Sequence, residues 1–91
     1  MHDIHLIEKI SRSVIGLCAE KQIYVIHELC ISVHKNSHVT EETLLGFMKN
    51  VKNSLVGEET RIRVLRDQSQ ESAALIRYID GYAGGDSITN I

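Results

Sequence analysis

Cysteine is scarce in this sequence, because only Cys18 and Cys30 occur among its 91 residues. Both fall in predicted regular elements and lack the paired spacing of a metal knuckle, so neither a disulfide framework nor a zinc ribbon is predicted. We expect two reduced thiols that act as small apolar core residues. No cysteine follows Asp67. A structural zinc site, which needs four ligands, is therefore not expected.

Long apolar runs, an excess of one charge and catalytic constellations are also missing. No run could span a bilayer, and no cationic start precedes an apolar core as in a signal peptide, so we expect a cytoplasmic protein without a membrane partner. The chain has 10 basic and 12 acidic residues and a net charge of −2, which does not favour nucleic acid as the main partner. No Ser/His/Asp or Cys/His arrangement and no glycine-rich loop after a strand supports catalysis, so an enzyme is not predicted.

The first half of the chain carries two clear periodic patterns. Apolar residues at three- and four-residue steps predict a helix from about Ile4 to about Lys21. The pattern then becomes extended and predicts a strand from Ile23 to His34. The inward side of this strand is expected to hold Val25, His27, Leu29, Ile31 and Val33. His27 is thus predicted to be a hydrogen-bonded, partly buried side chain rather than a metal ligand.

A second helix is expected from about Glu41 to about Leu55. Its start is marked by Thr40 and by a hydrophobic staple between Val39 and Leu44. Its apolar stripe is Leu44, Phe47, Met48, Val51 and Leu55. After Gly57, apolar residues alternate with arginines from Thr60 to Arg66. This alternation predicts a second strand whose arginines lie on a solvated face or edge.

Beyond Asp67, an Ala-Ala-Leu-Ile centre predicts a third helix over residues 69–78, and residues 87–91 are expected to form a short strand. A chain of 91 residues with 43% hydrophobic residues is long enough for one domain with a modest core. The predicted fold class is α+β. Two main helices pack on a short sheet of two or three strands in a small two-layer domain, and the third helix is a further C-terminal element.

The stretch Met1-His2-Asp3 offers metal chemistry. In a chain that begins at Met1, the amine and the His2 amide close a five-membered chelate ring, and the amide and Nδ1 of His2 close a six-membered one. Nitrogen donors in one plane suit Ni(II) or Cu(II) better than Zn(II), so copper competes with nickel on chemistry alone. Met1 should be retained, because the aminopeptidase that removes it tolerates only small residues next to it and His2 is bulky.

Four further residues that could bind metal also have a purely structural interpretation. Asp3 stands where a helix N-cap belongs, and its carboxylate could accept first-turn amides or contact a metal. His5 could approach a metal held by His2, although a solvated first-turn histidine is the simpler interpretation. His34 and His38 straddle a strand end and a loop, so they are not a helical pair of ligands and are expected at the surface.

Several segments in a fixed order resemble the nickel-binding half of the HypA family. They are Met1-His2-Asp3 before a helix, a strand rich in valine and isoleucine, the run Val39-Thr40-Glu41-Glu42-Thr43-Leu44-Leu45-Gly46-Phe47, and the run Ser54-Leu55-Val56-Gly57-Glu58-Glu59-Thr60-Arg61-Ile62-Arg63-Val64. HypA proteins are nickel-incorporation metallochaperones for hydrogenase and sometimes urease. The resemblance covers residues 1–66, which it implies are a nickel-binding domain.

The resemblance also implies the nickel ligands. They are the Met1 amine, the His2 amide and imidazole, and the Asp3 amide, with the Asp3 carboxylate and His5 as lesser candidates. The family begins Met-His-Glu, so Asp3 keeps backbone donation but shortens any side-chain contact. HypA proteins also carry a zinc domain with two Cys-x-x-Cys pairs after the strand that corresponds to Thr60 to Arg66. Here residues 67–91 are a cysteine-free extension that we expect to belong to the same domain.

Two functional hypotheses follow. The first is a nickel-binding, metallochaperone-like protein for maturation of a hydrogenase-type nickel enzyme, with Ni(II) as transient cargo. The resemblance implies a nickel-delivery GTPase of the HypB type, or a nickel enzyme precursor, as its partner. The second is a diverged HypA-like interaction module that no longer delivers metal and pairs through a sheet edge or its third helix. Either protein could form a homodimer.

Overall fold

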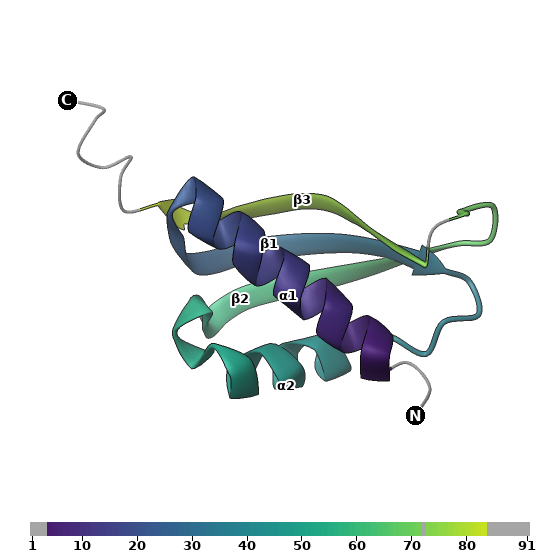
Figure 1. Cartoon of the computed structure of the whole chain (residues 1–91), viewed down its shortest axis with the longest axis horizontal. Coiled ribbons are helices and arrows are strands. Elements are labelled where there is room, and N and C mark those ends of the chain that lie inside the picture. The colour runs from purple at the N-terminus through teal and green to yellow at the C-terminus, as the bar shows by residue number, and fades with distance from the viewer. Residues whose placement is uncertain (1–3, 72, 84–91) are drawn as a thin grey trace.

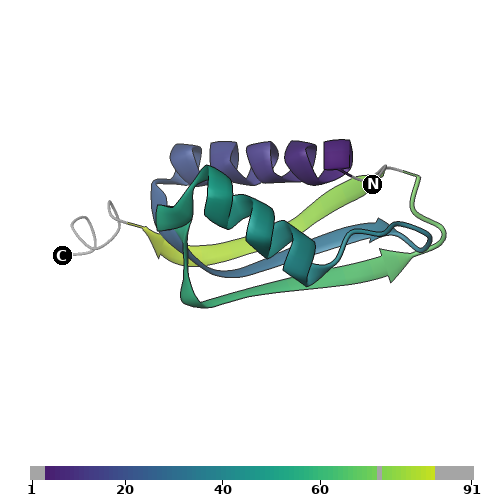
Figure 2. The ribbon, with the colours of Figure 1, turned by 90° about the horizontal axis from the view of Figure 1, so that it is seen from below.

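The computed structural model describes residues 4–71 and 73–83 of the chain. They form α1 (Ile4–Lys21), β1 (Ile23–His34), α2 (Glu41–Val51), a short 3-10 turn η1 (Asn53–Leu55), β2 (Val56–Asp67) and β3 (Ala74–Ala83). Both helices lie on the same face of one three-stranded sheet, as Figures 1 and 2 show. The predicted α+β class, with two helices packed on a small sheet, is confirmed. Neither described helix is long and apolar enough to cross a membrane.

The connection from α1 to β1 is tight, and both elements have the predicted bounds. α1 ends where Gln22 takes a φ of 62°, a left-handed conformation that stops the helix. The Gln22 N–H donates to the carbonyl of Ala19 at 3.3 Å. Strand β1 therefore starts one residue later and runs back beneath the helix. The buried side of α1 consists of Ile7, Ile10, Ser11, Val14 and Cys18.

Strand β1 is the centre of the sheet, whose order is β2-β1-β3. It pairs in parallel with β2 and antiparallel with β3. Leu29, Ile31 and Val33 are fully buried beneath the helices. The core is completed from α2 and its surroundings by Val39, Leu44, Met48, Leu55 and Val56. A single apolar layer between helices and sheet thus organises the domain.

A β-bulge in β1 overturns the inward placement of His27, and Val25, also expected inward, is half-buried and outside the core. The register with both neighbours shifts between Ile26 and Glu28. Ile26 is 1% exposed and joins the core, whereas His27 is exposed. The extra residue breaks the strict alternation on which the prediction rested. Thr60 of β2 stabilises the bulge. Its Oγ1 donates to the Ile26 carbonyl at 2.6 Å and accepts the Gly57 N–H at 2.9 Å.

The predicted third helix over residues 69–78 is wrong, because this part of the chain contains strand β3. The strand pairs with β1 from Val33 and Ala74 to Ile23 and Ala83. A register shift opposite Cys30 and Ile31 leaves Arg77 as an extra residue, so core-facing side chains follow the uneven spacing Ala74, Ile76, Ile79. The run Ala73-Ala74-Leu75-Ile76 favours a helix locally, whereas pairing with the free edge of β1 makes the segment a strand. The predicted strand over residues 87–91 lies outside the described residues.

Helix α2 begins as predicted and ends earlier. Thr40 is its N-cap, in a capping box with Thr43, and Val39 and Leu44 are both fully buried. The helix ends at Val51 rather than near Leu55, and η1 carries Leu55 into the core at 2% exposure. Val51, which was expected in the apolar stripe, is instead 53% exposed. Strand β2 starts at Val56 and is longer than the predicted strand.

Candidate functional site

The predicted metal ligands Met1, His2 and Asp3 lie outside the described residues, as does the proposed N-cap role of Asp3. His5 is an exposed residue in the first turn of α1. Helix α1 begins at the end of the molecule where β1 ends and the loop of residues 35–40 leads to α2 (Figures 1 and 2). The metal prediction therefore concerns this end of the molecule, which we call the α1 end.

The loop of residues 35–40 is held firmly at the α1 end. Arg66, at the end of β2, donates from Nη1 to the Ser37 carbonyl at 2.7 Å and from Nη2 to the Val39 carbonyl at 2.5 Å. The Glu41 carboxylate accepts the backbone N–H of Val64 at 3.1 Å. Sequence reasoning treated Arg66 only as a solvated strand residue, because nothing local signals that its guanidinium reaches across to a loop 27 residues earlier.

The two histidines near the end of β1, His34 and His38, have different surroundings. His34 is half-buried, and its Nδ1 accepts the Asn36 N–H at 3.2 Å. His38 is exposed in the loop. Among the described residues, no group of three or more His, Cys, Asp or Glu side chains could hold a metal ion.

The connection between β2 and β3 also lies at the α1 end. Asp67 turns the chain, because its Oδ1 accepts the Ser69 N–H at 3.0 Å and the Ser69 hydroxyl at 2.7 Å. The Ser69 hydroxyl, followed by its N–H, lowers the pKa of the Asp67 carboxyl. Gln70 then reaches back to β1, where its Nε2 donates to the Ser32 carbonyl at 3.1 Å and its Oε1 accepts the Ser32 hydroxyl. A few residues thus connect the strands at the place where the HypA resemblance would put a zinc domain.

Both cysteines are buried, as predicted, Cys18 in the core between helices and sheet and Cys30 on the opposite face of β1. Cys18 is 1% exposed on α1 and Cys30 is 2% exposed on β1, and neither forms a disulfide. Burial raises the pKa of the Cys18 thiol. A raised pKa disfavours the thiolate, which is the form that binds metal or attacks a substrate. Cys18 is therefore suited to packing rather than to chemistry.

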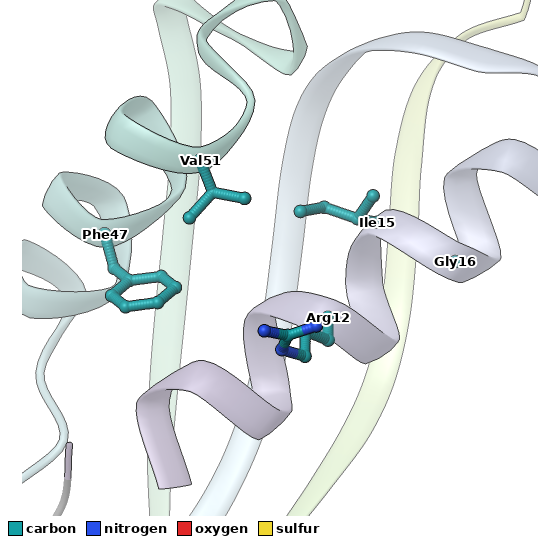
Figure 3. A pocket seen from close by; sticks show the side chains of 5 residues that line it. All are labelled: Arg12, Ile15, Gly16, Phe47 and Val51. Carbon is teal, nitrogen blue, oxygen red and sulfur yellow. The ribbon is translucent and has the colours of Figure 1, made fainter. Parts of the chain in front are cut away.

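A shallow groove of about 350 Å³ lies between the two helices (Figure 3). Ile15 of α1 and Phe47 and Val51 of α2 point toward the gap, and Arg12 closes one side. The guanidinium of Arg12 is already paired with Glu8 at 2.8 Å. The groove is thus mainly apolar, and its one charged group has a partner. It supplies no nucleophile and no set of metal ligands.

Residues 57–60 project from β2 beside the bulge in β1. Between Ile26 and Glu28 of β1, the facing strand advances from Val56 to Arg61. The exposed carboxylates of Glu58 and Glu59 therefore stand out from the sheet, next to a hollow of about 470 Å³ that His27 also lines. The sequence signal for this feature is only the pair of glutamates after Gly57.

The face of the sheet away from the helices is uncovered by any described element (Figure 2). We call it the open face and define it by residues that alternate with the core residues, namely Glu28, Cys30, Ser32, Arg61, Arg63, Leu65, Leu75, Tyr78, Asp80 and Tyr82. At its centre, the Tyr78 hydroxyl donates to Glu28 Oε2 at 2.7 Å, and Arg63 Nη1 lies 3.8 Å from the same oxygen. The hydrogen bond to Glu28 is the main cause that raises the pKa of Tyr78.

Aromatic rings continue the open face toward the start of β1. The ring centroids of Tyr24 and Tyr82 are 6.5 Å apart and stacked, and the His27 ring meets Tyr82 edge-on at 6.2 Å. His27 thus finds an aromatic neighbour at the surface rather than a place in the core.

No model of a known protein family matches the sequence, and no curated protein matches it either.

Proposed function

We propose that this protein is a nickel-binding, metallochaperone-like protein for maturation of a hydrogenase-type nickel enzyme. The observation that carries the proposal is the sequence Met1-His2-Asp3 directly before the helix that begins at Ile4. An amine, backbone amides and one imidazole form a nitrogen donor set that favours Ni(II) over Zn(II). As in the HypA resemblance, the ligands are the Met1 amine, the amide and ring of His2, and the Asp3 amide.

The surroundings of the α1 end support this proposal. Arg66 pins the neighbouring loop through the carbonyls of Ser37 and Val39, which fixes this loop near the start of α1. His5 is exposed in the first turn and can complete the coordination when the ion is captured or transferred. A partner, either a GTPase of the HypB type or a nickel enzyme precursor, then removes the ion by ligand exchange.

Calorimetric titration of Ni(II) into protein that begins at Met1 tests the proposal. His2→Ala removes the imidazole, and one residue added before Met1 displaces the chelating amine. Both changes should abolish the tight step, and a parallel Cu(II) titration measures how copper competes. His38→Ala is the matched control, because it removes a surface imidazole from the same end of the molecule and should leave the tight step in place. Tight binding that survives both N-terminal changes would refute the proposal.

The proton dependence gives the same test a second readout. The amine and the His2 ring must lose protons before they bind metal, and the amides must ionise. Nickel affinity should therefore rise with pH and fall in mildly acidic solution. An affinity independent of pH would contradict a site made of these donors.

A second candidate, an interaction module without metal delivery, is favoured by a different observation. Leu65, Leu75 and Tyr78 are each at least 40% exposed on the open face. Neighbouring exposed apolar side chains of this kind mark contact surfaces in soluble domains. The titration separates the two functions, since a pure interaction module would show no nickel step that depends on His2.

A further inference from the structure

The open face has the features of a contact surface, and it lies on the side of the sheet away from both helices (Figure 2). Its exposed apolar residues come from both edge strands, with Leu65 at 40%, Leu75 at 44% and Tyr78 at 42% exposure. We propose that a second copy of this chain docks on this face, sheet against sheet, with the two-fold axis nearly parallel to β1. This proposal does not rest on the nickel function.

The register of the sheet supplies the complementarity. Residues paired across β1 stand at the same level along the strands. From the end of β1 toward its middle, these levels are Leu65 and Leu75 beside Ser32, Arg63 and Tyr78 beside Cys30, and Arg61 and Asp80 beside Glu28. A two-fold rotation about an axis along β1 keeps each level and exchanges the two edges. Each residue of one edge strand therefore faces, on the second copy, the residue that stands at the same level on the other edge strand.

The pairs formed between the edge strands are favourable at all three levels. On the axis, Glu28 stands opposite its own copy, and each of these carboxylates keeps Tyr78 and Arg63 as partners. Leu65 of one copy meets Leu75 of the other. The symmetry forms this contact twice, and each contact buries two apolar side chains. Arg63 meets Tyr78, whose ring and hydroxyl both suit a guanidinium. Arg61 meets Asp80, an opposite charge, and the symmetry forms this ion pair twice. The surface is thus complementary to itself, as an interface between identical copies requires.

The other simple face-to-face arrangement is unfavourable. An axis across the strands would lay β2 of one copy on β2 of the other. With this axis at the level of Cys30, Arg63 would face the Arg63 of the second copy, and like charges across an interface cost free energy. Arg61 would face Leu65 and Asp80 would face Leu75, so both charges would lack an opposite charge. The charge pattern therefore selects the arrangement with the axis along β1.

The polar groups at the centre of the open face already have partners within the same copy. Glu28, Arg63 and Tyr78 satisfy one another, with the Tyr78 hydroxyl 2.7 Å from the carboxylate and 3.5 Å from Arg63 Nη1. A charge that enters an interface with its partner costs much less than an unpaired one. Docking would cover these groups without leaving an isolated charge at the centre.

The size of the face indicates a weak dimer. Three strands of about ten residues cover roughly 35 Å by 14 Å, from the usual rise per residue and strand spacing. Two such faces bury on the order of 1,000 Å² together, near the lower limit for a specific interface. We therefore expect a dimer that forms with rising protein concentration rather than a permanent one.

Sedimentation equilibrium of the complete chain over a wide concentration range is the first test. The apparent mass should rise from 10.2 kDa toward twice that value. The single changes Arg61→Glu and Asp80→Lys should each weaken self-association by at least about tenfold, because each puts like charges opposite each other twice per dimer. A chain that stays monomeric at all concentrations would overturn the proposal.

Mixing the two variants gives the sharper test. In a mixed dimer, Glu at position 61 of one copy faces Lys at position 80 of the other, and the native Arg61 and Asp80 form the second pair. The mixed dimer should therefore be about as stable as the wild-type dimer, and native mass spectrometry distinguishes it from either homodimer. Variants that do not prefer each other would show that positions 61 and 80 do not face each other.

Control variants on the helix side have matched charge changes. Lys49→Glu and Glu20→Lys alter exposed residues of α2 and α1 and should leave the dissociation constant unchanged. Arg61→Gln and Asp80→Asn remove the charge without reversing it, and should weaken the dimer by a smaller factor. A dimer that the helix-side changes weaken as much as the changes at positions 61 and 80 would place the interface elsewhere and refute the proposal.

Discussion

The two faces of the sheet are buried by different means. On the covered face, Leu29 and Ile31 have no exposure because two helices lie over them. On the open face, Cys30 and Ser32 are 2% and 3% exposed although no described helix covers them. Longer side chains from β2 and β3, together with Gln70, flank these small residues.

This difference shows that the middle strand of a narrow sheet can be buried on both sides with one layer of helices. Small residues in the centre are hidden by their larger neighbours on the edges, which themselves stay exposed. The covered face thus supplies the apolar core, and the open face supplies a surface whose central polar groups are paired and whose edges carry both apolar and charged side chains. The following changes test that division, from the largest expected effect to the smallest.

Truncation of a leucine on each face should give the largest contrast. Leu29→Ala removes a fully buried side chain and should lower the free energy of unfolding by about 2–5 kcal/mol. Leu65→Ala changes a side chain that is 40% exposed and should cost less than about 1 kcal/mol. Urea unfolding followed by circular dichroism, at a concentration where the chain is monomeric, measures both. Equal losses would mean that the open face is packed as tightly as the core.

Two glycine-to-alanine changes should have opposite signs. At Gly81 a new Cβ would lie 2.4 Å from the Val25 carbonyl oxygen and 2.8 Å from Ile23 Cγ2, so the strands must separate. We expect a loss of about 1–3 kcal/mol. At Gly16 nothing lies within 4 Å of the new Cβ, and the residue is within α1. Gly16→Ala should therefore stabilise the protein by about 0.5–1 kcal/mol, and thermal unfolding of both variants would show the two signs.

Thr60 should matter because it fixes the bulge that sends Ile26 to the covered face. Thr60→Val removes one hydrogen bond to the Ile26 carbonyl and one from the Gly57 N–H. A loss of about 1–2 kcal/mol is expected. Thr60→Ser keeps the hydroxyl and serves as the control. Faster amide exchange at Gly57 in the valine variant alone would support this role, and unchanged exchange would contradict it.

The smallest effect concerns pH and the open face. The hydrogen bond from Tyr78 to Glu28 raises the pKa of the phenol, so the protonated form is favoured in the folded state. This stabilisation is present below the unfolded pKa of about 10 and is lost as pH rises through the higher folded pKa. Absorbance titration should show one late-ionising tyrosine that Tyr78→Phe removes. A titration unchanged by that substitution would refute the assignment.

Most of the covered face could be predicted from the sequence, because its signals are local. The three- and four-residue spacing in α1, the β-branched run of β1 and the Thr40 capping signal each depend on a few neighbouring residues. Ile62 and Val64 were placed inward and the adjacent arginines outward, as the structure has them. These predictions are confirmed.

The failures lie where distant segments decide. His27 is outward because of the bulge in β1. Thr60 holds this bulge through the Ile26 carbonyl, which lies 34 residues earlier in the chain. Residues 74–83 form a strand because they pair with the free edge of β1, although the run Ala73-Ala74-Leu75-Ile76 favours a helix locally. The nickel ligands Met1, His2 and Asp3 stay a prediction that rests on their chemistry and on the HypA resemblance.

By itself, the sequence determined the bounds of α1 and β1, the start of α2 and the chemistry available before Ile4, since each depends on neighbouring residues. The tertiary structure alone decided that β3 completes the sheet, that Arg66 pins the loop at the α1 end, and that Arg61 and Asp80 stand at one level on the open face. These features require strand register and contacts between segments far apart in the chain, which only the folded backbone specifies.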